Sequence, residues 1–295
     1  MSDERISGSE LEDALSAIAD ESRISILQAL WKLDGATASF SALHDATPIT
    51  DSGQFNYHLG KLRPEFVRKQ EEGYKLTTAG RKVIGAAVSG RYTDNDVSVD
   101  PVQAGECPDC GAVLETTYKD GTVSVACTDC GNALTKGLNA PPVLATNTDA
   151  ENLPQLFSRL VLTRFQRMAR GFCPLCGGHT GRSLLRDIDA PDDFDTPLPW
   201  LELRCLACDH HIAQPVGALA LDHPAVIGFL FENGLDIRTT PLWEFDWLTD
   251  EHATVTSEEP LRVEITIDLG DAGMYLTLDE ELTVDSYERL NRESA

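Results

Sequence analysis

The chain has 295 residues, 42% hydrophobic and 24% charged, which suits two or three small domains and argues against bulk disorder. Its formal net charge of −24 is unfavourable for a protein that binds a polyanion, unless the charge is unevenly placed. No apolar run reaches the roughly eighteen residues of a membrane span, and the acidic N-terminus lacks the apolar core of a signal peptide. We therefore expect a cytoplasmic protein without a membrane partner.

The charge is distributed unevenly along the chain. Residues 1–92 carry 11 Lys and Arg against 13 Asp and Glu, whereas residues 93–295 carry 13 against 35. Within residues 53–92 the balance reverses, with eight basic side chains against three Glu. A short basic segment in an acidic protein is typical of a nucleic-acid-binding surface. The acidity elsewhere fits either adaptation to high intracellular salt, which screens self-repulsion, or an acidic solubilising surface.

Apolar residues at helical spacing and residues suited to capping predict five helices in the N-terminal region, over residues 10–19, 21–33, 40–46, 51–63 and 78–90. The expected N-caps of the last four are Asp20, Ser39, Asp51 and Thr77. The side chains expected to face the core are Leu11, Leu15, Ile18, Ile24, Leu27, Leu30, Trp31, Phe55, Leu59 and Leu62.

A β-hairpin is predicted between the last two of these helices. Its strands are FVRKQ and YKLT, its turn lies at Glu72-Gly73, and Pro64 ends the helix before it. The short helix and helix 51–63, joined by a turn, form a helix-turn-helix arrangement that places helix 51–63 in the major groove of DNA. The hairpin is then the wing of a winged helix.

Helix 51–63 and the wing supply the expected DNA contacts. Gln and Asn can pair bidentately with adenine, and Lys and Arg neutralise phosphates. The alternative is an ordinary solvated polar face with a charged hairpin. The candidate residues are Ser52, Gln54, Asn56, Tyr57, His58, Lys61 and Arg63 from the helix region, and Arg68, Lys69 and Lys75 from the wing.

The rest of the chain is predicted to hold linkers, two cysteine clusters and some regular structure. Residues 93–104 and 139–150 read as linkers, and residues 151–170 as an amphipathic helix. HPAVIGFLFENG is a further expected helix, and LRVEITIDL and MYLTLDEEL are expected strands. The predicted aromatic and aliphatic core of this half, or an apolar pocket in it, comprises Leu156, Phe165, Phe229, Phe231, Trp243, Phe245 and Trp247.

All eight cysteines fall in C-x-x-C pairs, which favours metal ligation over disulfides in a chain without a secretion signal. The first cluster is Cys107, Cys110, Cys127 and Cys130, with a predicted hairpin turned at Lys119-Asp120-Gly121. The second cluster is Cys173, Cys176, Cys205 and Cys208, where Asp209 replaces the glycine that follows the other three pairs.

Four thiolates complete a tetrahedral Zn²⁺ site without an open position, so we expect two structural zinc sites. A redox dithiol or an iron–sulfur centre is the alternative. His179, His210 and His211 lie near the second cluster and could substitute as ligands, but since four cysteines suffice they are expected to be surface or supporting residues. Because the surrounding sequence is acidic, we favour a scaffolding or partner-binding role for the clusters over DNA contact.

The predicted fold class is a multidomain α+β protein. Residues 1–92 form the winged helix-turn-helix domain and residues 105–138 the first zinc ribbon. Residues 151–295 form a regulatory or dimerisation region with the second zinc-ribbon-like module at 171–211, a helix and antiparallel strands. No enzyme signature is present, and the Asp192-Asp193 pair in an acidic loop is expected to be solvated charge. The protein is therefore not expected to be an enzyme.

The runs IADESRISILQALW, FSALHDA, DSGQFNYHLGKL and FVRKQEEGYKLTTAGRKVIGA resemble the ArsR-type winged-helix regulators of halophilic archaea. The C-terminal HPAVIGFLFENGLDIRTTPLWEFDWL is also similar to the distal region of that group. The resemblance implies sequence-specific binding of double-stranded DNA as a homodimer, and salt adaptation. No cysteine precedes Cys107, so metal-triggered release from DNA is not implied.

Two rival interpretations remain open. The alpha subunit of archaeal transcription factor E also joins a winged helix to a four-cysteine ribbon, which would make this chain a general initiation factor that docks on the transcription machinery. Against it stand two clusters instead of one and a long C-terminal region. The other alternative is a ligand-sensing or protein-docking zinc module without specific DNA binding.

Overall fold

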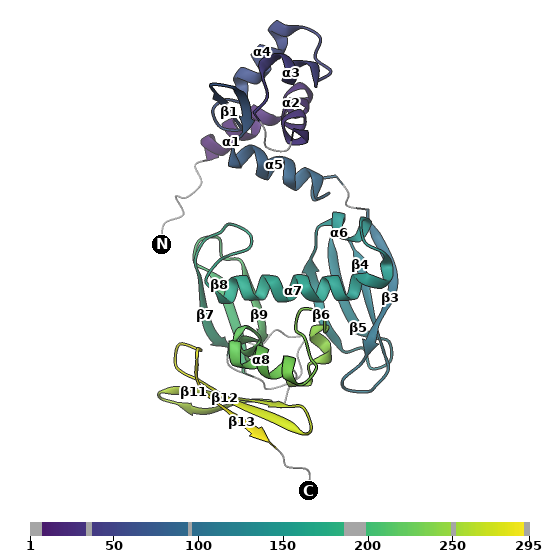
Figure 1. The fold of residues 1–295 in the computed structure, drawn as a ribbon, viewed down its shortest axis with the longest axis vertical. Coiled ribbons are helices and arrows are strands. Elements are labelled where there is room, and N and C mark those ends of the chain that lie inside the picture. Colours follow the sequence, from purple (N-terminus) through teal and green to yellow (C-terminus); the bar gives the residue numbers. More distant parts are fainter. Residues whose placement is uncertain (1–7, 34–36, 94–95, 186–198, 249–251, 292–295) are drawn as a thin grey trace. The chain divides into compact units, whose positions relative to one another are not determined.

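The computed structural model describes residues 8–33, 37–93, 96–185, 199–248 and 252–291. The protein is α+β, with helices gathered near the N-terminus and four antiparallel sheets in the described chain (Figure 1). It divides into two compact units. Unit 1 comprises residues 1–97 and 141–146, and unit 2 comprises residues 98–140 and 147–295. None of the described helices is long and apolar enough to cross a membrane.

Unit 1 is mainly helical. Its helices are α1 (Gly8–Ile18), α2 (Glu21–Lys32), α3 (Phe40–Asp45), α4 (Ser52–Lys61), α5 (Thr78–Val88) and α6 (Pro142–Thr146), and its hairpin is β1 (Val67–Gln70) with β2 (Gly73–Leu76). The first five helices are confirmed to within a few residues. The four predicted N-caps are also confirmed, since the side chains of Asp20, Ser39, Asp51 and Thr77 each accept a bond from a backbone N–H in the first turn.

The core of unit 1 forms around α2, which packs against α3, α4, α5 and β2. Phe55, Leu59 and Leu62 are buried as predicted. The predicted stripe on α2 is partly wrong, because Ile24 and Trp31 are 41% and 39% exposed. The buried residues are instead Ile26, Leu27, Ala29 and Leu30. Ala29 contributes little to an apolar sequence pattern because its side chain is small, but the same small size lets neighbouring elements pack closely against α2. Leu11 and Leu15 on α1 are also exposed.

The hairpin gains a third partner from Ala38. Its N–H donates to the Tyr74 carbonyl (2.9 Å), and the Tyr74 N–H donates to the Ala38 carbonyl (2.8 Å). Gln70 pairs with Gly73, so the turn lies at Glu71-Glu72, one residue earlier than predicted. Gly73 adopts a φ of 142° beside this bridge, and a Cβ there would lie 2.0 Å from the Ala38 carbonyl oxygen.

Gly73→Ala is therefore expected to destabilise unit 1 by at least about 3 kcal/mol, because the added methyl group combines unfavourable φ with a backbone clash. When thermal unfolding is followed by the NMR signals of the α2 and α4 amides, the midpoint temperature of unfolding should fall by more than about 10 °C. Gly60→Ala on α4 is the matched control, since nothing lies within 4 Å of its added Cβ. It should be neutral or stabilise by up to about 1 kcal/mol. Equal midpoints for the two variants would contradict the bridge.

The described residues of unit 2 form three sheets whose neighbouring strands are all consecutive and antiparallel. The first sheet is β3 (Ser98–Glu106), β4 (Val113–Lys119), β5 (Thr122–Cys127) and β6 (Ala133–Asn139); the second is β7 (Thr180–Leu185), β8 (Trp200–Cys205) and β9 (His211–Pro215); the third is β10 (Ala253–Glu258), β11 (Leu261–Asp268), β12 (Ala272–Leu278) and β13 (Val284–Asn291). Helix α7 (Leu153–Ala169) contacts the first two sheets, and α8 (Pro224–Glu232) follows the second (Figure 1).

The linker predictions are wrong where the chain joins these sheets. Residues 98–104 of the predicted first linker belong to β3, and α6 lies within the second. Pro101 argues against a strand in the sequence, because proline has no backbone N–H to donate to a neighbouring strand. The strand tolerates it because β3 is an edge strand and its register shifts between Val99 and Val102. The predicted helices over 151–170 and 223–234 are present as α7 and α8, and the C-terminal sheet has four strands where two were predicted.

Residues 105–138 and 151–295, which the sequence divides, lie in the same compact unit. One contact that joins them is Trp243, whose buried side chain completes a small core with Ala104, Cys107, Leu114, Val125 and Cys127. Its indole Nε1–H donates to the Ala104 carbonyl at 2.7 Å. An aromatic residue from the distal chain thus replaces a core that the first cysteine module cannot build from its own residues.

Candidate metal centres and basic surface

The first cysteine cluster sits at one end of the β3–β6 sheet. Cys107 follows β3, and Cys127 ends β5. The β4–β5 hairpin brings the two pairs together through a turn at Asp120 and Gly121, both with positive φ (51° and 73°). An Asp-Gly pair favours this two-residue turn, so the hairpin predicted from the sequence is confirmed. The hairpin positions two ligand pairs that are distant in the chain.

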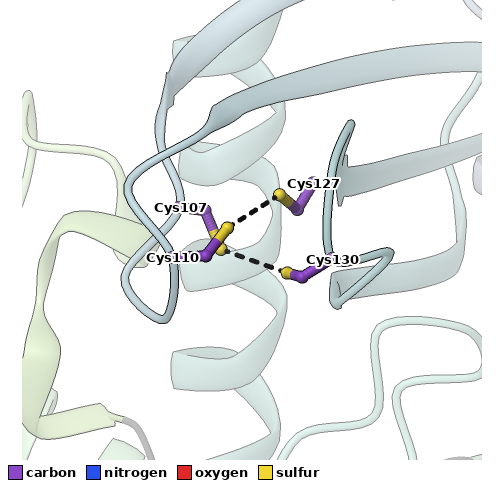
Figure 2. A group of neighbouring side chains, drawn as sticks. All are labelled: Cys107, Cys110, Cys127 and Cys130. Atoms are coloured by element: carbon purple, nitrogen blue, oxygen red, sulfur yellow. Dashed lines mark hydrogen bonds between the residues drawn. The ribbon is translucent and has the colours of Figure 1, made fainter.

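The four sulfurs of the first cluster converge (Figure 2). The Sγ atoms of Cys107 and Cys130 are 3.8 Å apart, and those of Cys110 and Cys127 are 3.5 Å apart. All four lie within 4.8 Å of one another. Cys107 and Cys127 are buried, whereas Cys110 and Cys130 are exposed at the edge. These cysteines could hold one metal ion, as the spacing predicts.

The second cluster repeats this arrangement between α7 and the β7–β9 sheet. The Sγ atoms of Cys173 and Cys208 are 3.8 Å apart, and those of Cys176 and Cys205 are 3.5 Å apart. Its four sulfurs also lie within 4.8 Å of one another, so two metal ions could be held in all. The longer gap between its pairs includes residues 186–198, and the Asp192-Asp193 pair lies there, outside the described residues.

Each cluster is built from tight loops in which backbone N–H groups point at sulfur. The N–H groups of Asp129, Leu175, Gly178 and Ala207 donate to cysteine Sγ atoms at 3.3–3.4 Å. The residue after the second cysteine of each pair has positive φ: 73° at Gly111, 74° at Gly131, 78° at Gly177 and 62° at Asp209. Asp209 therefore adopts the conformation of the glycine that it replaces, which aspartate tolerates better than most residues.

Asp209→Val is expected to weaken metal retention at the second cluster, because a β-branched side chain in the left-handed conformation costs roughly 1–2 kcal/mol or more. Asp209→Gly should retain metal like the wild type, since the ion pair that Asp209 makes with Arg204 is largely exposed. A competition titration with a chromogenic chelator measures both. The matched control is Asp129→Val in the first cluster, where φ is not positive. Equal retention in both valine variants would contradict this interpretation.

The loops also favour thiolate. The backbone N–H of Asp129 lowers the pKa of Cys127 to about 6 against the opposing effect of burial. The backbone N–H of Cys208 likewise lowers the pKa of Cys205 to about 6. Each cluster therefore contains one buried sulfur that the backbone prepares for the anionic form that binds metals.

The histidines near the second cluster do not join its ligands. Among the described residues, the two groups close enough to hold a metal consist of cysteines alone. His179 and His211 are exposed, and His210 is half-buried. His211 Nδ1 lies 3.1 Å from the Asp209 carbonyl oxygen, which places it beside the knuckle.

In unit 1, the predicted DNA-contacting side chains gather on α4 and the hairpin. Ser52, Gln54, Asn56 and Tyr57 of α4 are exposed, and Tyr57 is 58% exposed. We call Lys61, Arg63, Arg68, Lys69 and Lys75 the basic surface; the first four are exposed and Lys75 is half-buried.

The cations of the basic surface lie close to two tyrosine rings. Lys61 Nζ lies 5.5 Å from the centre of the Tyr57 ring. Arg63 Cζ and Lys69 Nζ lie 5.8 and 5.9 Å from the centre of the Tyr74 ring. Tyr74 thus sits between a cation that follows α4 and a cation from β1. The end of α4 and the hairpin therefore share one surface.

His58 departs from the predicted polar face. Its side chain is buried, with 8% of the residue exposed, and its Nδ1 lies 3.4 Å from the Asp20 carboxylate. Asp20 is the N-cap of α2, so His58 ties α4 to the start of α2. The sequence pattern could not distinguish this inward histidine from its exposed neighbours, since its partner lies 38 residues earlier.

Comparison with protein families gives two matches. Residues 104–284 match a family described as Domain of unknown function (DUF7351). The chain belongs to this family. Residues 11–87 match a second family, described as Domain of unknown function (DUF7347). No curated protein and no solved structure matches the chain. The DUF7351 match covers both cysteine clusters, and the DUF7347 match covers the basic surface.

Proposed function

We propose that this DUF7351 protein is a DNA-binding transcription regulator whose unit 1 is a winged helix-turn-helix. In this proposal α4 enters the major groove, the β1–β2 hairpin is the wing, and zinc occupies both cysteine clusters. The order of elements supports it. Helices α3 and α4 are joined by a short turn, and an isolated bridge from Ala38 pairs with β2 of the hairpin, which is compatible with a winged helix.

The observation that carries the proposal is the unpaired charge of the basic surface. In the stretches of chain that the structure describes, none of its five cations forms an ion pair with a carboxylate. Other described cations also lack an ion pair, so what distinguishes these five is that they gather on one surface of a chain with twice as many acidic as basic residues. DNA phosphates would supply the missing counter-charge, while Gln54 and Asn56 offer base-pairing groups on the same helix. His58 is left out of this proposed contact set because it is buried.

Zinc is the metal that we propose for both clusters. Four sulfurs at the corners of a tetrahedron about 2.3 Å from Zn²⁺ lie about 3.8 Å apart, which is close to the observed separations of 3.5 and 3.8 Å. Four thiolates leave no open position for a substrate, so the sites are structural and the chain is not proposed to be an enzyme. The resemblance to the ArsR-type winged-helix regulators adds to the proposal that the protein binds duplex DNA as a homodimer.

Genome-wide occupancy of the protein, paired with transcript changes after its deletion, tests this function. A sequence-specific regulator should occupy a limited set of promoters, and transcripts should change at those promoters. Occupancy at nearly all active promoters would favour the general initiation factor instead. If no genomic site is enriched when the protein is expressed at its normal level, a protein-docking or ligand-sensing module would be favoured.

A further inference from the structure

A cavity of about 110 Å³ lies within unit 2, between the strands that leave the two cysteine clusters. Leu134 and Thr135 on β6 form one wall, and Gln214 and Pro215 on β9 form another. Helix α7, the 3-10 helix Val216–Asp222 and the segment 242–248 complete the lining. None of its lining residues is a cysteine of the two clusters or a member of the basic surface.

The lining is suited to a small neutral molecule. It is mostly aliphatic and aromatic, including Phe165, Trp243 and Phe245, and it contains no charged side chain in the described chain. Thr135 and Gln214 are its polar members, and both are partly exposed, which gives a polar rim with access to solvent. Since an apolar cavity of roughly 150 Å³ accommodates benzene, this smaller cavity has room for about four non-hydrogen atoms.

Hydrogen bonds hold the walls in place without a ligand. The Leu242 N–H donates to Ser158 Oγ on α7 at 2.8 Å, and Ser158 is buried. Trp243 is held by its bond to the Ala104 carbonyl. Gln155 of α7 donates to the Thr239 carbonyl at 2.7 Å, just before the same segment. A preformed apolar cavity with a few fixed polar groups is the usual form of a small-molecule site.

One wall also belongs to the first cysteine cluster. Trp243 lines the cavity and packs in the same core as Cys107 and Cys127.

The remaining aromatic residues of the predicted pocket have other roles. Phe229 and Trp247 are buried in the main core of unit 2, and Phe231 is 64% exposed, so its assignment to core or pocket is wrong.

We propose that this cavity is a binding site for a neutral organic molecule of about four non-hydrogen atoms, with an apolar body and one hydrogen-bonding group, such as a short-chain alcohol or ketone. The apolar body lies against Phe165, Trp243 and Phe245, and the polar group faces Thr135 and Gln214. A carboxylate is excluded because no cation in the lining offsets its desolvation. The site depends on unit 2 alone and stands whether or not unit 1 binds DNA.

Titration of the full-length, metal-loaded protein with 2-propanol, propane and acetate tests the site. Methyl NMR signals of Leu134, Leu221 and Leu242 should shift saturably with 2-propanol, while those of Leu27 and Leu59 in unit 1 stay unchanged. Acetate should bind at least about ten-fold more weakly than 2-propanol, because its charge must be desolvated. Propane should bind more weakly than 2-propanol by about five-fold, the loss expected for one hydrogen bond.

Two matched variants locate the site. Thr135→Phe fills the rim and should weaken 2-propanol binding at least about ten-fold. Thr117 on β4 is half-buried in the same sheet but does not line the cavity, so Thr117→Phe should leave affinity within about two-fold. If Thr135→Phe loses metal or folding, Ala218→Leu fills the cavity from a different element. Absence of saturable shifts, equal losses in the filling and control variants, or tighter binding of acetate would overturn the proposal.

Discussion

Cys127→Ser is expected to reduce the metal content from two ions per chain to one and to unfold the β3–β6 sheet. Cys127 is buried and its sulfur is one of four in the first cluster. The core beneath that cluster is small, with Ala104, Cys107, Leu114, Val125 and Trp243 as its other buried members. Since this end of the sheet buries little apolar surface, we expect it to depend on the proposed metal for stability.

The magnitudes support a large effect. Structural zinc sites with four protein ligands contribute roughly 10–16 kcal/mol of apparent binding free energy near pH 7. A whole domain is stable by only about 5–15 kcal/mol, so loss of the ion exceeds what the small core can offset. Metal analysis after a chelator challenge gives the stoichiometry, and hydrogen exchange gives the protection of β3–β6.

Thr128→Ser is the matched control for the cysteine variant. Thr128 lies between two ligands of the same cluster, and serine keeps the hydroxyl that donates to the Val113 carbonyl. It should retain two ions. Unit 1 should keep its exchange protection in both variants, because all eight cysteines lie in unit 2. Two ions retained by Cys127→Ser, or a coloured iron–sulfur cluster in the wild type, would contradict the zinc assignment.

Lys61→Ala/Arg63→Ala is expected to weaken duplex binding by about 10- to 100-fold at fixed salt. Both cations are exposed, and they lie at the end of α4 beside the hairpin. If each contacts a phosphate, the slope of log affinity against log salt should fall by about two. Fluorescence anisotropy at several salt concentrations measures both quantities.

The control for this variant is Lys119→Ala/Arg159→Ala. These side chains are exposed cations of unit 2, so the control changes the net charge equally. It should leave both affinity and salt slope unchanged within error. An equal loss in the two double variants would mean that the total charge of the chain, and not the surface of α4, governs binding.

Local features of unit 1 could be predicted from the sequence because their causes are local. Asp20, Ser39, Asp51 and Thr77 cap helices within three residues of themselves. The cysteine clusters were equally predictable, since C-x-x-C spacing fixes two ligands and the Asp120-Gly121 turn joins the pairs of the first cluster.

The features that sequence analysis missed depend on distant partners. The burial of His58 depends on Asp20, and the third strand of the hairpin is a single bridge from Ala38 to Tyr74. The union of the first cluster with the C-terminal region depends on Trp243, which is 139 residues from its hydrogen-bond partner. No periodicity or spacing in the chain encodes such contacts.

The central claim is that unit 1 contacts duplex DNA through α4 and the hairpin. The most direct test adds a DNA duplex that the protein binds and records which backbone amide signals of the full-length protein shift in NMR spectra. Perturbations should concentrate in residues 52–63 and 67–76, with residues 105–138 and 171–185 unchanged. Perturbations that concentrate around the cysteine knuckles and spare α4 would contradict the account.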